Sequence, residues 1–201
     1  MRVVIATKNP DKVREMGAVI ARLMPGIEIV AGLDWPDVAE TGASLEENAL
    51  LKARAVTAAT GLPAIADDTG LEVDALGGAP GVHTARLAGP TATYAENRHR
   101  LLALLEGCSD RAARFRTAIA FVDGEREVVV DGVLEGSIAR EERGTGGFGY
   151  DPVFVVGGRT LAEIGEAEKN RISHRARALE SLARLWAWGD RPSTLASEEG
   201  S

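Results

Sequence analysis

The spacing of apolar residues along the chain predicts short strands that alternate with longer amphipathic helices. The first segment, Val3 to Ala6, is rich in β-branched residues, which is typical of a strand. The next carries apolar side chains at helical spacing, at Val13, Met16, Val19, Ile20 and Leu23. The same criteria predict strands at 27–33, 63–67, 115–121, 128–130 with a continuation at 132–139, and 153–156, while 71–76 fits either a strand or a helical turn.

Helix starts are marked by residues that can accept hydrogen bonds from the first helical turn. Asn9 is followed by Pro10, and proline suits the first helical position because its missing N–H is not needed there. Ser44 and Thr93 each stand three residues before a glutamate, which is the capping-box pattern. The expected helices run from Pro10, from Ser44 to before Gly61 and from Thr93 to before Gly107, with a short one from Thr160 and a last one over 174–189.

Asp123-Gly124, between two apolar runs, is a strong signal for a β-hairpin. A hairpin joins antiparallel strands, so the sheet cannot be purely parallel even though strands and helices interleave. We therefore expect an α/β protein with a mixed sheet. With 201 residues the chain is long enough for one domain, which we assign to 1–189, and the polar segment 190–201 is expected to be a disordered tail.

Composition narrows the class of protein. Hydrophobic residues make up 45% of the chain and supply a core, and a net charge of -7 argues against a nucleic-acid partner. A small anionic ligand stays possible wherever basic residues converge. No apolar run approaches membrane-spanning length, and the short apolar start does not fit a signal peptide, so we expect a cytoplasmic protein without a membrane partner. Cys108 is the single cysteine, which excludes a disulfide within the chain.

Asp67 and Asp68 stand at the end of the apolar run that begins at Pro63, and Thr69-Gly70 follows them. Two adjacent carboxylates repel each other and persist together where water, a cation or a basic group neutralises them. One interpretation is a buried strand that opens into a functional site. The other is a solvated turn, since Asp and Gly are common turn residues.

The segment from Thr7 to Lys12 joins the first strand to the first helix. A helix N-terminus offers free backbone N–H groups and a positive dipole end, which suits phosphate, and Thr7, Asn9 and Lys12 add side-chain donors. The segment lacks the glycines of a P-loop. The alternative is a well-capped helix with a surface lysine.

Lys52 lies in the middle of the apolar face of its helix, so its ammonium group must either reach solvent or meet an anion. Glu40, Glu46 or Glu47 could be structural partners, and we favour a phosphate or carboxylate at a site. Glu40 itself, beside Thr41-Gly42, could be either a loop acid or a metal ligand.

The segment from Gly144 to Pro152 contains G-x-G-x-x-G, but a strand rather than a helix is expected after it, which argues against a dinucleotide site. Glycines around Phe148 favour a loop that lets a flat ligand stack on the ring, as opposed to a flexible surface loop. A second cluster, Lys169, Arg171, His174 and Arg175, gathers basic groups where Ser173 can cap the last helix. The alternative there is ordinary surface charge on a connecting loop.

Together these segments resemble the inosine triphosphate pyrophosphatase family, also called the XTP/dITP diphosphatases. The resemblance runs from Val3 to about Leu185. The matching pieces are Thr7-x-Asn9-x-x-Lys12, Glu40-Thr41-Gly42 with Glu47-Asn48-Ala49 and Lys52-Ala53, Ala66-Asp67-Asp68-Thr69-Gly70-Leu71, Leu76-Gly77-Gly78-Ala79-Pro80-Gly81, Gly144 to Pro152, and Glu168-Lys169-Asn170 with Ile172-Ser173-His174-Arg175. Any one of these would be a weak signal, whereas six in order are specific.

The resemblance implies an elongated mixed α/β fold with two lobes around a cleft, a homodimer, and Mg²⁺-dependent hydrolysis of deaminated purine nucleoside triphosphates to monophosphate and pyrophosphate. Glu40 and Asp68 would hold Mg²⁺, and Asp68 would also be the general base for the attacking water. The positions that would bind the substrate are Thr7, Lys8, Asn9, Pro10, Asp11, Lys12 and Lys52 on the phosphate side, and Phe148, Gly149, Tyr150, Asp151, Lys169, His174 and Arg175 around the base. Thr69, where many members have serine, would donate its hydroxyl to the ligand.

The chain departs from the family pattern at a few positions. Lys8 replaces a common glycine, His83 and Leu87 stand where tyrosines are frequent, and Ile164 replaces a common methionine. Two competing hypotheses are a nucleotide sensor without hydrolytic activity and a pyrophosphatase for modified pyrimidines or methylated bases. The retained acids Glu40, Asp67 and Asp68 argue against the first. The Phe148 loop and His174-Arg175 argue against the second.

Overall fold

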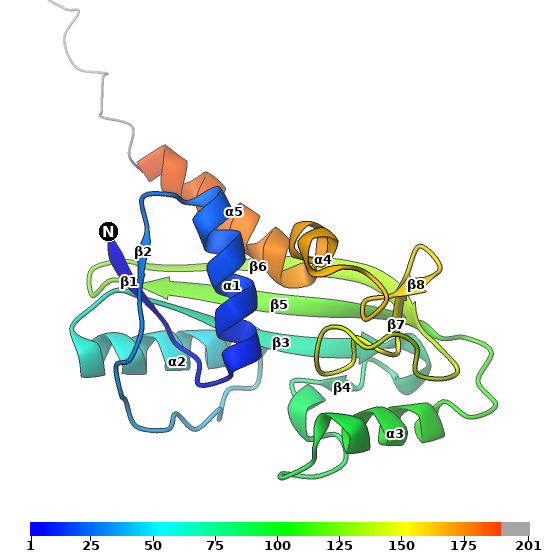
Figure 1. Cartoon of the computed structure of the whole chain (residues 1–201). Coiled ribbons are helices and arrows are strands. Elements are labelled where there is room, and N and C mark those ends of the chain that lie inside the picture. Colours follow the sequence, from blue (N-terminus) through cyan, green and yellow to red (C-terminus); the bar gives the residue numbers. More distant parts are fainter. Residues whose placement is uncertain (190–201) are drawn as a thin grey trace, which may run out of the picture.

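The computed structural model describes residues 1–189. Its strands are β1 (Arg2–Ile5), β2 (Glu28–Val30), β3 (Ala64–Val73), β4 (Pro80–Gly81), β5 (Ala112–Val122), β6 (Glu127–Ile138), β7 (Phe154–Val156) and β8 (Arg159–Thr160). They form one sheet in the order β2-β1-β3-β5-β6-β7-β8, with β4 added beside β3. β1 runs parallel to β2 and β3, whereas the other pairs are antiparallel, which confirms the mixed α/β fold (Figure 1).

The described α-helices are α1 (Pro10–Leu23), α2 (Leu45–Thr60), α3 (Tyr94–Leu104), α4 (Glu166–Ile172) and α5 (His174–Gly189). Except for α4, they begin directly after capping residues that the sequence marks. The Asn9 side chain accepts the N–H of Asp11 at 2.9 Å, and Thr93 forms a complete capping box with Glu96. Ser44 accepts the N–H of Glu47, but the Glu47 carboxylate accepts the N–H of Ala43, so that box is displaced by one residue.

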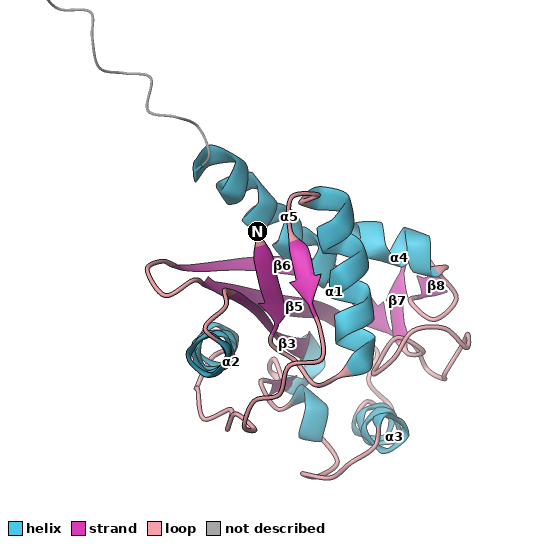
Figure 2. Ribbon diagram, turned by 60° about the vertical axis from the view of Figure 1, so that its left-hand side comes forward, coloured by secondary structure: helices cyan, strands magenta, loops and turns pink. Residues whose placement is uncertain are grey.

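Helices cover both faces of the sheet. Helices α1 and α5 lie on one face and α2 lies on the other (Figure 2). Because side chains alternate along a strand, Ile65, Ile119 and Phe121 pack under α1 and α5, while Ala64 and Ala66 pack against α2. A third apolar cluster, with Leu71 and Val73 of β3, packs with α3 at the far end of the sheet. The layers thus fix which face each residue of β3 presents.

Three expected elements differ from the structure. The strand predicted to stop at Asp67 continues to Val73, because β5 pairs with every residue of β3 and satisfies its backbone through the acidic stretch. The strand expected at 27–33 covers only Glu28–Val30.

The helix expected at Thr160 begins instead at Glu166. Thr160 ends β8, although its N–H donates to Glu163 Oε2 at 2.7 Å in the manner of a cap. The local capping signal therefore forms a turn without a helix.

None of the helices in the described part is long and apolar enough to cross a membrane. The tail predicted at 190–201 lies outside the described residues. The assignment of 1–189 to a single two-lobed domain stays a prediction.

Candidate active site

Strand β3 continues well beyond the end of its neighbour β1. β1 pairs with β3 as far as Ile65, and β4 begins to pair at Leu71. Between these points, among the described strands, the segment 67–70 is paired on one side only, with β5. This gap in the sheet holds Asp67 and Asp68, and a cavity of about 150 Å³ opens beside it.

The cavity collects most of the residues that the sequence predicted to form a site. The predicted residues that line it are Asn9, Lys12, Glu40, Asp68, Thr69, Phe148, Gly149, Tyr150, Asp151, Lys169, His174 and Arg175. They come from segments as far apart as the start of α1 and the start of α5. The fold therefore brings the phosphate-side and base-side candidates to one place.

Asp67 and Asp68 face opposite sides of the sheet, because successive residues of a strand alternate. The carboxylate of Asp67 lies 3.0 Å from Lys12 on α1 and 3.1 Å from Arg175 on α5. The carboxylate of Asp68 lies 2.9 Å from Lys52 on α2. The two acids therefore avoid mutual repulsion, and each has its own basic partners.

Lys52 joins Asp68 to Glu40. Its ammonium group donates to Asp68 Oδ1 at 2.9 Å and to Glu40 Oε1 at 2.8 Å. The amide of Asn48, one turn earlier on α2, donates to Asp68 Oδ2 at 3.3 Å and accepts the N–H of Gly42 at 2.8 Å. A Cβ at Gly42 would overlap the Asn48 side chain, so glycine is needed for the Glu40 loop to reach α2.

Burial and charge act on these groups in different directions. Burial raises the pKa of the Asp68 carboxyl above its ordinary value, and Lys52 only partly opposes this. Burial also opposes ionisation of Glu40, but the charge and hydrogen bond of Lys52, together with the charges of Lys12 and Arg86, outweigh it and lower the pKa of Glu40. For Lys52, burial is outweighed by Asp68, Asp67 and Glu40, so its pKa is raised and it stays an ammonium ion. Asp68 is thus the more basic of the two carboxylates.

Asp67 belongs to a buried ionic network on the other face. Burial disfavours its charged form, but Lys12 and Arg175 outweigh this and hold its pKa far below the ordinary value. Arg175 also donates to Glu15 Oε2 at 2.8 Å, and Lys169 lies 3.6 Å from the same oxygen. The network joins α1 to α5 and fixes the basic groups beside the cavity.

The loop that follows Gly144 places an aromatic ring at the cavity. The Asp151 carboxylate accepts the N–H of Phe148 at 2.7 Å, which closes the turn, and the ammonium group of Lys169 at 2.6 Å. Gly147 has a φ of 70°, and a Cβ there would collide with that carboxylate. Lys169 consequently lies 4.6 Å from the centre of the Phe148 ring, close enough for a cation–π contact. These hydrogen bonds close the turn and hold the Phe148 ring at the cavity.

The remaining residues predicted from the first loop lie outside the cavity lining. Thr7 accepts the N–H of Asn9 at 3.2 Å, and Pro10 is the first residue of α1. Asp11 pairs with Arg14 on the same helix. Lys8 pairs with Asp37 at 2.6 Å, and 51% of its side chain is exposed.

The sequence missed several residues at the site, and four of them show why. Asn48 and Thr117 left a detectable signal, because each is a polar side chain on a mainly apolar face. Asn48 lies one turn before Lys52 on α2, and Thr117 stands between apolar residues on one face of β5. The sequence carries no such signal for Glu15, since an acid on an amphipathic helix usually lies on its solvated face. Tyr94 accepts the amide of Asn9 at 2.9 Å and lies 6.2 Å from the Phe148 ring, a contact that only the fold creates.

Glu40 and Asp68 form a donor set that fits a hard divalent cation, because such ions prefer carboxylate oxygens. One oxygen of each lies within 2.9 Å of the same Lys52 nitrogen, so the two groups converge on one cationic position. Within residues 1–189, no three His, Cys, Asp or Glu side chains are grouped to hold a metal. The two carboxylates would therefore share a bound cation with other oxygen ligands, such as phosphate or water.

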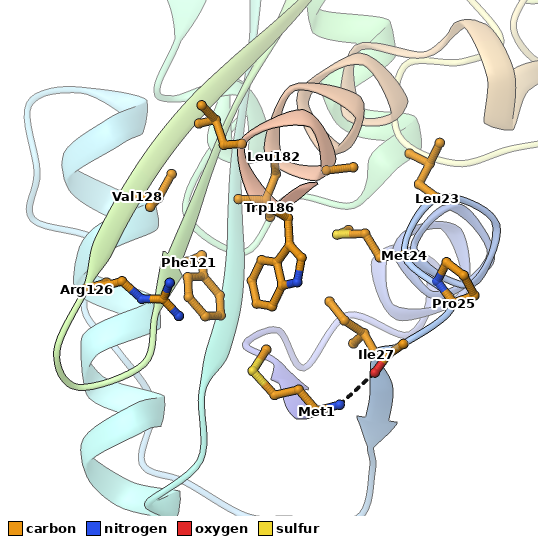
Figure 3. Close-up of a pocket in the computed structure, with 13 residues that line it drawn as sticks. Met1, Leu23, Met24, Pro25, Ile27, Phe121, Arg126, Val128, Leu182 and Trp186 are labelled. Carbon is orange, nitrogen blue, oxygen red and sulfur yellow. Dashed lines mark hydrogen bonds between the residues drawn. The ribbon is translucent and has the colours of Figure 1, made fainter. Parts of the chain in front are cut away.

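A larger hollow of about 540 Å³ lies at the other end of α1 and α5. Figure 3 shows Trp186, Phe121 and Met24 facing into it. Of the described side chains that line it, only Arg126 is charged. A ligand site normally combines apolar surface with converging polar groups, so the cavity beside β3 has the chemistry of a site and this hollow does not.

Comparisons with known proteins show which family this chain belongs to. The model of the Ham1 family matches residues 3–185. A dITP/XTP pyrophosphatase of Geobacillus kaustophilus is 50% identical over 192 residues, which cover 92% of this chain and 93% of the relative. The structure of a HAM1 protein from Coxiella burnetii has a TM-score of 0.83 at 43% identity, covering 94% of this chain and 99% of that one. A nucleoside-triphosphatase and dITP/XTP pyrophosphatase from Mycobacterium abscessus has a TM-score of 0.70 at 45% identity, covering 90% and 98%.

Proposed function

This chain belongs to the Ham1 family, and from that premise we propose that it hydrolyses deaminated purine nucleoside triphosphates, such as ITP, dITP and XTP, to the nucleoside monophosphate and pyrophosphate. The observation that supports this most is the arrangement at the gap in the sheet. There the buried acid Asp68 lines the same cavity as Lys12, at the start of α1, and Phe148, in the loop after Gly144. Such a cavity suits a substrate with a phosphate end and a flat base.

The phosphate end of the substrate would bind near α1 and α2. Lys12 and Lys52 bring two ammonium groups close to the carboxylates of β3 at 3.0 and 2.9 Å. A triphosphate carries several negative charges that repel a nucleophile, and these lysines would neutralise them and stabilise the pyrophosphate that leaves. The N-terminus of α1, with Asn9 at the cavity, adds a favourable dipole.

Asp68 is the group we assign to activating water. Its pKa is raised by burial, so it accepts a proton more readily than an exposed aspartate. The amide of Asn48 and the ammonium group of Lys52 hold its two oxygens in place. The proton of the attacking water would pass to this carboxylate as the bond to phosphorus forms.

We assign Mg²⁺ as the cofactor, with Glu40 and Asp68 as its protein ligands. When bound, the ion supplies Lewis-acid charge stabilisation at the phosphate oxygens. Lys52, which donates to the two carboxylates at 2.8 and 2.9 Å, would also contact the phosphates of the substrate. We also expect a cytoplasmic homodimer that binds neither nucleic acid nor membrane, as the family resemblance and the net charge of -7 suggest.

The base would stack on Phe148, with Lys169, His174 and Arg175 as polar neighbours. Deaminated purines carry an oxygen at position six, whereas adenine carries an amino group there. Hydrogen-bond donors from these side chains would favour the oxygen and leave adenine mismatched. A site of this kind can discriminate by up to about 10⁴-fold.

A nucleotide panel with Mg²⁺ tests the proposal. Pyrophosphate release from ITP, dITP and XTP should greatly exceed release from ATP and GTP, with little orthophosphate formed. Asp68→Asn should lower kcat by about 10²–10⁴-fold, the usual contribution of a general base. Asp37→Asn, which removes an exposed carboxylate outside the cavity, is the matched control and should keep the rate.

Two results would contradict the proposal. Orthophosphate as the main product would show that a different bond is cleaved. Nucleotide binding without any turnover would instead favour a sensor on the same scaffold.

A further inference from the structure

A row of hydrogen-bonding side chains links Arg175 to His174 beside the cavity. Arg175 Nη2 donates to Thr69 Oγ1 at 3.3 Å, and this oxygen lies 2.7 Å from Thr117 Oγ1. Thr117 Oγ1 in turn lies 2.5 Å from Nδ1 of His174. Thr69 and Thr117 meet because they are directly opposite each other in the register of β3 and β5. The row therefore depends on residues from three separate elements.

The direction of these hydrogen bonds follows from what each group can donate. A guanidinium group only donates, so Thr69 is an acceptor toward Arg175. Thr69 has one hydrogen, which can go to Thr117 at 2.7 Å or to Asp67 Oδ2 at 3.2 Å. Hydroxyl hydrogen bonds span roughly 2.5–3.0 Å, so the bond to Thr117 is the favourable one.

Asp67 Oδ2 also has less need of that hydrogen. It already receives donors from Lys12 at 3.0 Å and from Nε of Arg175 at 3.1 Å. Thr69 therefore donates to Thr117. Since the Thr117 oxygen is then occupied as an acceptor on that side, its own hydrogen points to Nδ1 of His174.

The charge state of His174 decides which ring nitrogen carries the proton. Its ring is buried and rests 4.7 Å from the ring of Phe115. Burial, with the nearby charges of Arg175 and Lys169, lowers the pKa of His174 well below its ordinary value, so the ring is neutral at neutral pH. A neutral imidazole whose Nδ1 accepts a hydrogen bond carries its single proton on Nε2.

We propose that Thr117 is a positioning residue that fixes His174 as the Nε2–H tautomer, so that the ring presents a hydrogen-bond donor to the six-oxo group of the base. The inference rests on the proposed function for its substrate. Nε2 has no hydrogen-bond partner among the described residues, and His174 lines the cavity with Phe148. The opposite tautomer would present an acceptor and would suit the amino group of adenine. The hydroxyl of Thr117, without touching substrate, thereby selects which purines fit.

The first measurement is the tautomer itself, which needs neither substrate nor activity. The chain contains three histidines, so His83→Gln/His99→Gln leaves His174 as the single source of imidazole signals. In ¹⁵N NMR at neutral pH we expect a protonated Nε2 and an unprotonated Nδ1. A protonated Nδ1 in this protein would overturn the inference directly.

Substitutions at Thr117 give the second measurement. Thr117→Val keeps the shape and removes the hydroxyl, and we expect the tautomer ratio to shift by about tenfold toward Nδ1–H, the effect of one lost hydrogen bond. Thr117→Ser keeps the hydroxyl and should restore the signals of the unsubstituted protein. Thr117→Ala is a second variant without the hydroxyl and should show the same shift of the tautomer ratio as Thr117→Val. Unchanged tautomers in both hydroxyl-free variants would overturn the inference.

The kinetic consequence separates positioning from a general structural role. In Thr117→Val, the ratio of kcat/KM for ITP to that for ATP should fall about tenfold, through a higher KM for ITP at nearly constant kcat. Loss of a purely structural residue would lower kcat/KM for ITP and for ATP by the same factor, and that result would overturn the proposal. Thr57→Val, which removes a hydroxyl bonded to the Val122 carbonyl away from the cavity, is the control and should leave the ratio unchanged.

Failure of this inference differs from failure of the proposed function. Protonated Nδ1 with normal pyrophosphate release from ITP rejects the role of Thr117 and leaves the function standing. Protonated Nε2 with no pyrophosphate release from any purine nucleotide rejects the function, and with it the substrate assigned to the His174 donor.

Discussion

Asp67 is the acid whose removal should most affect the stability of the protein. Its side chain is fully buried and lies 3.0 Å from Lys12 and 3.1 Å from Arg175. Asp67→Asn keeps the shape of the side chain but removes its charge. Lys12 then loses the anion that compensates its burial, whereas Arg175 keeps Glu15 at 2.8 Å.

The size of the effect follows from these contacts. Removing one partner from a buried ion pair usually costs about 3–5 kcal/mol. We expect the lower end, about 3 kcal/mol of the free energy of unfolding, because Arg175 keeps a second anion and the Lys12 side chain is 19% exposed. Urea unfolding followed by circular dichroism measures the difference. Asp37→Asn, which removes a surface acid, should change stability by less than about 0.5 kcal/mol.

The pH dependence gives an independent check on the same reasoning. The folded-state pKa of Asp67 lies far below its ordinary value because Lys12 and Arg175 outweigh the effect of burial. Its contribution is therefore present above the unfolded pKa of about 3.9 and is lost as the pH falls toward the folded value. The gap in stability between the native protein and Asp67→Asn should thus narrow below about pH 4.

Binding of inorganic tripolyphosphate gives a third measurement on Asp67→Asn. It should stabilise Asp67→Asn more than the native protein, because the uncompensated Lys12 gains an anion. A loss of less than 1 kcal/mol at pH 7, or a stability gap that does not depend on pH, would refute the view that Asp67 neutralises the basic cluster.

Three further predictions concern the aromatic loop, the first loop and the packing of α5. Phe148→Ala should raise KM for ITP about tenfold at nearly unchanged kcat, since stacking on a base is worth about 1–3 kcal/mol. Lys8→Ala should change KM by less than about twofold, because Lys8 is exposed and pairs with Asp37. Gly132→Ala should destabilise the protein by about 1–3 kcal/mol and reduce activity, because the new Cβ would strike the backbone of α5 at His174 and Ala178. Steady-state kinetics check all three substitutions, and urea unfolding checks the last.

Each of these predictions has a contradicting outcome. Unchanged KM in Phe148→Ala would exclude stacking, and a tenfold higher KM in Lys8→Ala would place Lys8 on the phosphates. For Gly132→Ala the control is Gly26→Ala, where nothing lies within 4 Å of the added Cβ. Equal effects of the two glycine substitutions would show that the packing of α5 on β6 is not the cause.

Much of the architecture is local and could be predicted from the sequence. Asn9 and Thr93 cap their helices through hydrogen bonds made within three residues, and the Asp123-Gly124 hairpin joins strands that are adjacent in the chain. Thr160 is the exception, because its local capping contacts form but the chain continues into a turn. The candidate site was predicted from short motifs and from their resemblance to a known family, which gave the residues without the contacts between them.

Only the tertiary structure decided on which face of β3 each residue of the candidate site lies. The sequence places Asp67 and Asp68 side by side, but pairing with β5 keeps the strand extended through them, so they point in opposite directions. One consequently meets Lys12 and Arg175, and the other meets Lys52. The row from Thr69 through Thr117 to His174 likewise exists only because two strands and a helix come together. Contacts between residues a hundred positions apart leave no periodic signal in a sequence, so charge and hydrogen-bond direction at the site are properties of the fold.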